Sequence, residues 1–337
     1  MPSPRIRPTT ARRPAKRLAL GRLAIGLGAL ACPRPAGAVE YGLSLYQLGL
    51  VTPSPGVTPP SGLYFYDVFA YYRGSGELHA HARVPDSSRV TYAIAGDLAI
   101  FALYTDFELF GGRLGFATTN AFGSQSTGVA TPYVDAQGSP GVMRFGKEVQ
   151  GFADSELTAL LGWRAGDNHF KLYVSGFIPT GDYDPARLAQ TGLNRPALDV
   201  KGAYTFIGSD TGFEVSAALG MTLNATNTKT DYSSGAELHF EWTLGQHLPQ
   251  GLFMGVGGYF YQQVTPDSGP GAVYGGFEGR VAAVGPVLSY RLRTEGQEVY
   301  LSAKWYHEFA NYNRVAGNTL FATLGFPLWA PPPGVAR

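Results

Sequence analysis

The sequence predicts an all-β fold, a transmembrane up-and-down antiparallel β-barrel of about 12 strands. Three observations predict it: long segments that alternate between apolar and polar residues, connections that are alternately short and long, and a composition with only 15% charged residues. Soluble domains carry about 25% charged residues, so the composition argues against an ordinary water-covered surface.

Residues 234–245, SGAELHFEWTLG, illustrate the alternation. Successive side chains of a strand point to opposite faces. One face here is apolar and the other largely ionisable, with Leu238, Phe240 and Trp242 opposing Glu237, His239 and Glu241. A soluble sandwich would bury the apolar face, whereas an outer-membrane barrel would expose it to lipid and turn the ionisable face to a watery lumen. This strand alone leaves both alternatives open.

Alternating segments recur along the whole chain after about residue 61. They lie near 62–73, 89–105, 110–124, 150–165, 168–180, 196–207, 211–225, 232–245, 250–264, 276–293, 296–310 and 316–329. Most are longer than the 5–6 residues usual in soluble sheets and match the length of membrane-spanning strands. The sequence therefore predicts one barrel domain over residues 62–329.

The connections between these segments take turns in length. Short ones include AGDN (165–168) and GSDTG (208–212), and long ones include 125–149, 181–195, 224–235 and 265–276. A meander places consecutive connections at opposite ends, so all long loops lie on one side, as in outer-membrane barrels. We therefore expect the apolar faces to contact lipid and the ionisable faces to line the lumen. Aromatic girdles are expected where outward faces end, at Tyr64, Tyr104, Trp163, Tyr290 and Trp329.

Residues 1–38 have the three parts of an export signal: a basic start, an apolar stretch and a small-residue site at Ala36-Gly37-Ala38. Cleavage after Ala38 would remove eight basic residues and leave 18 basic against 25 acidic ones. Such an acidic chain argues against nucleic acid as a partner. The alternative of lipidation at Cys32, within ALAC, stays open.

Residues 39–61 precede the first strand and are rich in both proline and apolar residues. Proline cannot donate a ladder hydrogen bond, so a strand is disfavoured. An apolar tail exposed to water would be sticky. We therefore expect this segment to enter the lumen as a plug, with Tyr46, Leu48 and Leu50 offering contacts to a hydrophobic solute. An additional strand or a strap on the outer surface is the alternative, and residues 330–337 are expected to form a tail.

The ionisable residues on the predicted inner face are candidates for a substrate path. They are Glu156, Arg164, Lys171, Asp199, Lys201, Glu214, Glu237, His239, Glu241, Lys304 and Glu308. Two interpretations stay open: paired wall residues that hold the barrel shape, or a narrow polar constriction that passes small solutes. His79 and His81 form an H-x-H pair without an evident third ligand, and no nucleophile signature occurs. We expect no metal, no cofactor and no enzymatic activity.

Several long stretches resemble the family described as the phenol meta-pathway degradation protein. They include PTGDYDPARLAQTGLN, GRVAAVGPVLSY and KWYHEFANYNRVAGN, and the start YQLGLVTPSPGVTPPSGLYF is also similar. The resemblance covers nearly the whole chain after residue 38. It implies an outer-membrane channel for passive uptake of small hydrophobic or aromatic compounds of the phenol type, associated with their degradation.

Several partners follow from this interpretation: the bilayer with its lipopolysaccharide, the outer-membrane assembly machinery, and the hydrophobic or aromatic solute. The alternative is a structural or adhesive outer-membrane barrel with a closed lumen.

Overall fold

A computed structural model describes residues 40–78, 88–273, 275–276, 278–294 and 297–330. The expected signal peptide with Cys32, the His79/His81 pair and tail residues 331–337 lie outside the described residues.

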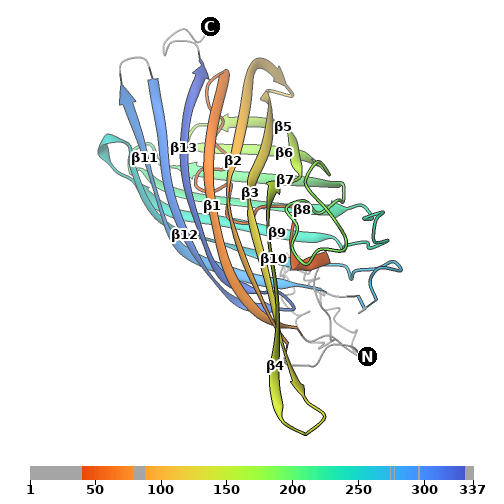
Figure 1. The fold of residues 1–337 in the computed structure, drawn as a ribbon. Coiled ribbons are helices and arrows are strands. Elements are labelled where there is room, and N and C mark those ends of the chain that lie inside the picture. Colours follow the sequence, from red (N-terminus) through yellow and green to blue (C-terminus); the bar gives the residue numbers. More distant parts are fainter. Residues whose placement is uncertain (1–39, 79–87, 274, 277, 295–296, 331–337) are drawn as a thin grey trace, which may run out of the picture. The chain divides into compact units, whose positions relative to one another are not determined.

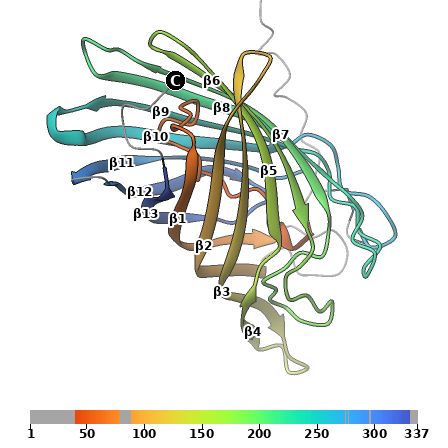
Figure 2. The ribbon, with the colours of Figure 1, turned by 90° about the horizontal axis from the view of Figure 1, so that it is seen from above.

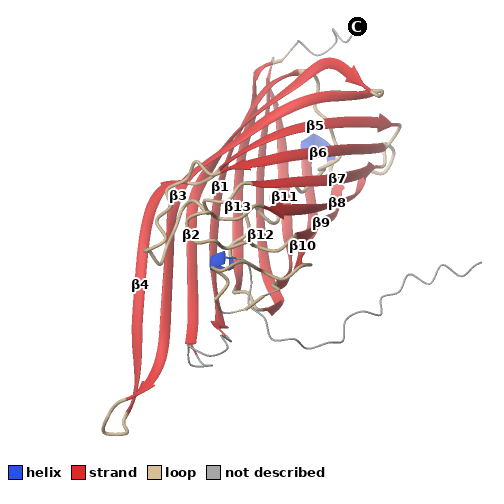
Figure 3. Cartoon of the chain, turned by 90° about the vertical axis from the view of Figure 1, so that its right-hand side faces the viewer, coloured by secondary structure: helices blue, strands red, loops and turns tan. Residues whose placement is uncertain are grey.

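The described residues form thirteen strands and two short 3-10 helices. Figures 1 and 3 show how these elements are arranged. The elements are η1 (Glu40–Gly42), β1 (Gly62–Leu78), β2 (Ser88–Leu109), β3 (Gly112–Val134), β4 (Pro140–Phe152), β5 (Ser155–Ala165), β6 (Asn168–Ile178), β7 (Ala197–Ile207), β8 (Phe213–Asn224), β9 (Glu237–His247), η2 (Pro249–Gly251), β10 (Leu252–Gln263), β11 (Arg280–Thr294), β12 (Gln297–Tyr312) and β13 (Ala316–Trp329). Within these residues, no helix is long and apolar enough to cross a membrane.

The strands form a closed antiparallel barrel, and Figure 2 shows them from above. β13 pairs with β1, and β2 pairs with both β1 and β3, so the sheet returns on itself. β4 and β5 lie one after the other along the same side of β3, from Phe122↔Phe152 to Arg113↔Gly162. Counting these two as one position gives a barrel of twelve strands, which confirms the predicted fold class.

One part of the strand prediction is wrong. Residues 125–149 were expected to be a long loop, but most of them belong to β3 and β4, joined by a turn at 135–139. The predicted strand 150–165 is also interrupted at Ala153–Asp154. Both faces of β4 are largely exposed, and the alternation of Met143 and Phe145 with Arg144 is broken at Lys147, so the stretch lacks the clear contrast that marks a half-buried strand. Figure 1 shows the β4 hairpin projecting beyond the neighbouring strands.

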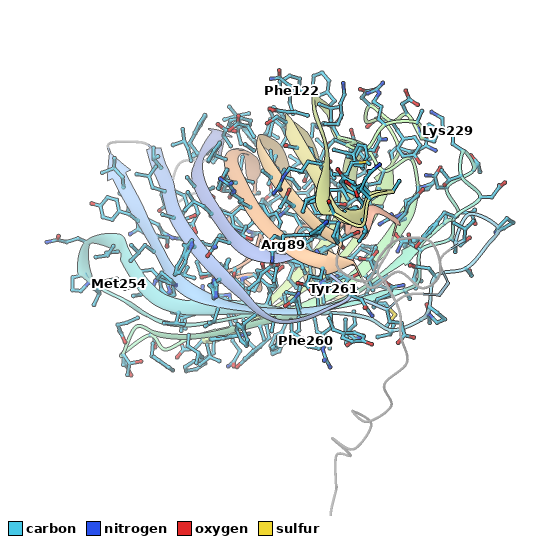
Figure 4. All side chains as sticks on the ribbon, turned by 60° about the horizontal axis from the view of Figure 1, so that its bottom comes forward. Arg89, Phe122, Lys229, Met254, Phe260 and Tyr261 are labelled. Atoms are coloured by element: carbon cyan, nitrogen blue, oxygen red, sulfur yellow. The ribbon has the colours of Figure 1, made fainter. Side chains whose placement is uncertain are left out.

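The two faces of the strands are assigned as predicted. Outward side chains such as Leu219, Leu244 and Val256 are exposed, while Glu237 and Glu241 are fully buried on the inner face. Figure 4 shows the same alternation on β10, where Phe260 points outward and Tyr261 points into the barrel. The apolar face of SGAELHFEWTLG is thus the outer, lipid-facing one.

Three of the expected girdle residues differ from the prediction. Tyr290 is exposed on the outer face, but Tyr64, Tyr104 and Trp329 border the internal cavity. The reason is parity: Tyr64 has the same orientation as Val68, and Val68 is buried inside the barrel.

The main hydrophobic core lies inside the barrel. It joins Tyr46 and Leu48 of the N-terminal segment to inward side chains of β1, β2 and β10–β13, among them Tyr259 and Phe321. Between η1 and β1 the segment forms no strand. A chain that enters the lumen without sheet hydrogen bonds must have its polar backbone groups paired by other means.

Candidate functional site

The N-terminal segment, residues 40–61, is tied at its start to the long loops. The Glu40 carboxylate accepts hydrogen bonds from Thr230 Oγ1 at 2.8 Å and from Asn227 Nδ2 at 2.9 Å. Slightly further along, buried Arg195 donates to the Leu43 carbonyl at 2.8 Å. These contacts place the start of the segment under the loops that follow β6 and β8.

The middle of the segment is held by two buried ionic side chains. Lys304 Nζ on β12 donates to the carbonyls of Gly49, Leu50 and Thr52 at 2.7, 2.8 and 2.7 Å. Glu241 on β9 accepts from Tyr46 Oη at 2.7 Å and from the Val51 amide at 3.2 Å. The barrel wall thus supplies both donors and acceptors to a backbone that has no sheet partner.

The end of the segment follows the same pattern. Glu214 on β8 accepts from the Ser54 amide at 2.8 Å and from Ser54 Oγ at 2.7 Å. Lys171 Nζ on β6 donates to the Val57 carbonyl at 2.5 Å. Tyr173 Oη on the same strand donates to the Pro55 carbonyl at 2.6 Å. Inward polar residues of β6–β9 and β12, the polar wall, therefore anchor the segment along its length.

A cavity of about 1900 Å³ remains between the segment and the other side of the barrel. Its lining there, the apolar wall, comes from β1, β2, β3 and β5 and is dominated by Val68, Ala70, Leu98, Ile100, Ala102, Ala117, Ala121 and Leu160. Ligand sites are usually apolar concavities with a few placed polar groups. This cavity has that character and is large enough for a small aromatic molecule.

The cavity reaches towards both ends of the barrel. At the end with the short turns it is bordered by Arg291 and Arg293, which pair with Glu298 at 3.1 and 2.9 Å, and by Trp329. At the other end it is bordered by Asp154 beside the β4–β5 break and by residues of loop 179–196. Its lining therefore spans the barrel lengthwise.

The predicted site residues fall into three groups. Four of them border the cavity: Glu156, Lys171, Lys201 and Lys304. Six others are inward but do not border it, because the segment or neighbouring wall residues cover them: Asp199, Glu214, Glu237, His239, Glu241 and Glu308. Arg164 is exposed near a hairpin turn, where it donates to the Gly166 carbonyl at 3.1 Å. The covered residues thus contact protein groups.

The three residues expected in a plug all lie within the lumen. Tyr46 and Leu50 border the cavity, whereas Leu48 is buried in the core. The apolar wall was not predicted as part of the site, although β2 carries a signal for it. AIAGDLAIFALY is apolar on both faces, unlike the strands of the polar wall.

The buried ionisable groups pair with one another or with the segment. His239 Nε2 lies 2.7 Å from Asp199, His247 Nε2 lies 2.7 Å from Glu214, and Arg195 lies 3.7 Å from Glu237. In the described part of the chain, no three His, Cys, Asp or Glu side chains gather to hold a metal ion. The arrangement provides binding and anchoring groups.

Comparison with solved structures supports the barrel assignment. An outer membrane channel from Pseudomonas putida F1 aligns with a TM-score of 0.63 and 14% identity, over 82% of this chain and 98% of that chain. Two likenesses are weaker. A FadL homologue of Pseudomonas aeruginosa aligns with a TM-score of 0.36 and 10% identity, over 87% of this chain and 97% of that chain. A TodX mutant, a monoaromatic hydrocarbon channel, aligns with a TM-score of 0.38 and 7% identity, over 80% of this chain and 91% of that chain. The first of these likenesses, together with the closed sheet, gives the chain the fold of a bacterial outer-membrane barrel.

Two comparisons with known sequences gave different results. The search of curated proteins found no match, whereas the comparison with protein families gave a match over most of the chain. The model of one family, described as the putative MetA-pathway of phenol degradation, matches residues 83–324. This range includes most of the barrel, with its polar wall and much of its apolar wall. The chain belongs to this family of putative phenol-degradation pathway proteins.

Proposed function

We propose that this protein is a passive outer-membrane channel for small hydrophobic or aromatic compounds, and that it is not an enzyme. One observation carries the proposal: the N-terminal segment pairs with charged residues of the polar wall such as Glu214, Glu241 and Lys304, while the opposite, apolar wall borders an internal cavity. A solute inside the barrel would meet Val68, Leu98 and Ile100 on one side. Transfer of apolar area from water to such a surface is favourable by about 25 cal/mol per Å².

We also propose that residues 40–61 act as a plug that narrows the route through the lumen. Lys304, Glu241 and Glu214 anchor the segment through charged hydrogen bonds. Glu156, Lys171 and Lys201 border the cavity. In this proposal they are the polar residues that line the path of the solute. We further infer that residues 1–38 are removed on export, and that lipopolysaccharide and the outer-membrane assembly machinery are partners.

Flux through the purified protein tests this proposal. Liposomes containing the full mature barrel should take up a phenol faster than a sugar of similar size, and no ion gradient should be needed. A variant that lacks residues 41–60 should conduct more ions and lose the preference for the aromatic solute, because the polar wall is then exposed. A matched control is the Lys147→Met variant, which changes an exposed lysine on the projecting β4 strand.

The alternative function, a structural or adhesive barrel with a closed lumen, makes the opposite prediction. Neither the full chain nor the deletion variant would then carry any solute, although both would be correctly folded. Folding is checked by the heat-dependent mobility of the barrel on denaturing gels.

A further inference from the structure

The side chain of Tyr46 occupies a closed pocket in the polar wall. Its ring stacks on the imidazole of His239, with a centroid distance of 3.6 Å and an angle of 15° between the planes. Its hydroxyl donates to Glu241 at 2.7 Å, and Lys201 Nζ lies 3.3 Å from the same oxygen and 4.5 Å from the ring centroid. These contacts match the parts of a phenol: His239 stacks on the ring, Lys201 lies over its π-electrons, and Glu241 accepts from the hydroxyl group.

The wall is built to present this surface. Lys201, Gly220 and His239 lie opposite one another on β7, β8 and β9. A Cβ atom on Gly220 would come within 2.4 Å of the His239 ring, so glycine makes room for the imidazole to lie against the sheet. Asp199 fixes the ring by its contact with Nε2 at 2.7 Å. The pocket walls therefore do not depend on Tyr46 for their position.

Tyr46 also separates this pocket from the cavity. Tyr46 and Lys201 border the cavity, whereas His239 and Glu241 behind them do not. Tyr46 belongs to the irregular segment rather than to the barrel sheet. Its removal would therefore open the pocket to the cavity while the wall residues stay on paired strands.

We propose that this pocket, formed by Lys201, His239 and Glu241, is a binding site for neutral phenols, and that Tyr46 occupies it as an internal ligand. A phenolic solute that reaches the cavity competes with Tyr46, takes over the hydrogen bond to Glu241 and releases the neighbouring part of the segment. This inference rests on the proposed channel function. It adds the class of solute, neutral phenols, and the way in which the solute releases the segment.

Chemistry sets the selectivity of the pocket. A hydrocarbon of the same shape would leave the buried Glu241 carboxylate without the hydroxyl donor, and sites that bind a hydroxyl group reject analogues that lack it. An aromatic carboxylate would place a second negative charge beside Glu241. In Tyr46 the carbon para to the hydroxyl leads back to the segment, so a para-alkyl group on a free phenol would point in the same direction, towards the cavity.

Competition determines the expected affinities. A tethered ligand has an effective concentration of the order of millimolar, so it masks the pocket from weak solutes. Tyr46→Ala removes this competitor. The detergent-solubilised full-length Tyr46→Ala variant should bind 4-methylphenol at least about tenfold more tightly than the wild type, as measured by isothermal titration. The affinity for toluene, which lacks only the hydroxyl group, should increase much less. Tyr133→Ala, which changes an exposed tyrosine on β3, is the matched control.

Two further variants keep the test decisive. Tyr46→Phe keeps the buried ring but cannot donate to Glu241, so it should also increase the affinity for 4-methylphenol if Tyr46→Ala fails to fold. Glu241→Gln in the Tyr46→Phe background should lower that affinity by about tenfold or more, because a hydrogen bond to a charged acceptor is lost. Equal gains for toluene and 4-methylphenol, or an unchanged affinity after Glu241→Gln, would overturn the proposal.

The binding assay does not depend on flux. Selective binding without any solute uptake would contradict the channel and leave the phenol site standing. Uptake without selective binding would leave the channel standing and refute the site.

Discussion

The Lys304→Met substitution should release the middle of the N-terminal segment. Lys304 is buried, and its ammonium group donates to three carbonyl groups, those of Gly49, Leu50 and Thr52, at 2.7–2.8 Å. Hydrogen bonds that involve a charged group contribute about 1.5–3 kcal/mol each. Methionine replaces the aliphatic stem but provides no donor, so all three bonds are lost together.

The size of the effect depends on water. Such bonds are not additive, and water in the cavity can pair with part of the exposed carbonyls, so the net loss is about 2–4 kcal/mol rather than the full sum. Each 1.4 kcal/mol changes an equilibrium constant tenfold. The ratio of released to bound segment should therefore increase by about 30-fold to 700-fold. A segment that is released one time in a thousand would then be released about 3% to 40% of the time.

Single-channel recording in planar bilayers measures this directly. The open probability of Lys304→Met should rise towards that of the variant lacking residues 41–60, while the open-state conductance of the two variants should agree. Lys147→Met removes an exposed positive charge and should behave like the wild type. If correctly folded Lys304→Met also recorded like the wild type, the segment would not be the gate, or Lys304 would not hold it.

Three further predictions concern orientation, the lipid face and a loop. An epitope tag in 181–195 should be accessible on intact cells and one in 208–212 should not, since consecutive connections lie at opposite ends of the barrel; equal accessibility would refute the orientation. Leu219→Arg should reduce the folded fraction on denaturing gels, because a cation near the bilayer midplane costs about 2–4 kcal/mol; unchanged assembly would mean that this face does not meet lipid. Burial raises the pKa of Asp267, in the loop after β10, to about 6, against hydrogen bonds that lower it. Its contribution to stability should be largest below about pH 4 and lost as the pH rises through 6, so proteolysis of this loop should accelerate over that range and Asp267→Asn should remove the dependence.

The barrel could be predicted from the sequence because its determinants are local. Alternation with period two assigns each side chain to a face, and loop lengths assign each end of the barrel. This is why Glu237 and Leu238 were assigned to the correct faces. The β4 hairpin was missed because its alternation is short and broken by Lys147, and because residues 125–149 also contain turn-forming Gly, Pro and Asp.

The division of the lumen could not be predicted in the same way. Parity shows that His239 and Glu241 face inward, but it does not show whether solvent, solute or another segment meets them. That outcome depends on contacts between residues about 190 positions apart, such as Tyr46 with Glu241. The composition of residues 39–61 indicated a buried segment, and only its path through the lumen identifies the groups it covers.

The pairing of a charged wall with a removable segment has a consequence for permeation. A barrel with bare inner residues such as Glu214, Glu241 and Lys304 would attract water and ions, and an apolar solute would gain little by entering it. With the segment in place, those charges are paired and the accessible surface is mainly apolar, so the barrel favours apolar solutes over ions. Complete loss of the segment would therefore not give a faster version of the same channel. It would raise the conductance and lower the selectivity for apolar solutes. A solute that displaces only the region around Tyr46 would raise the conductance less and leave part of that selectivity.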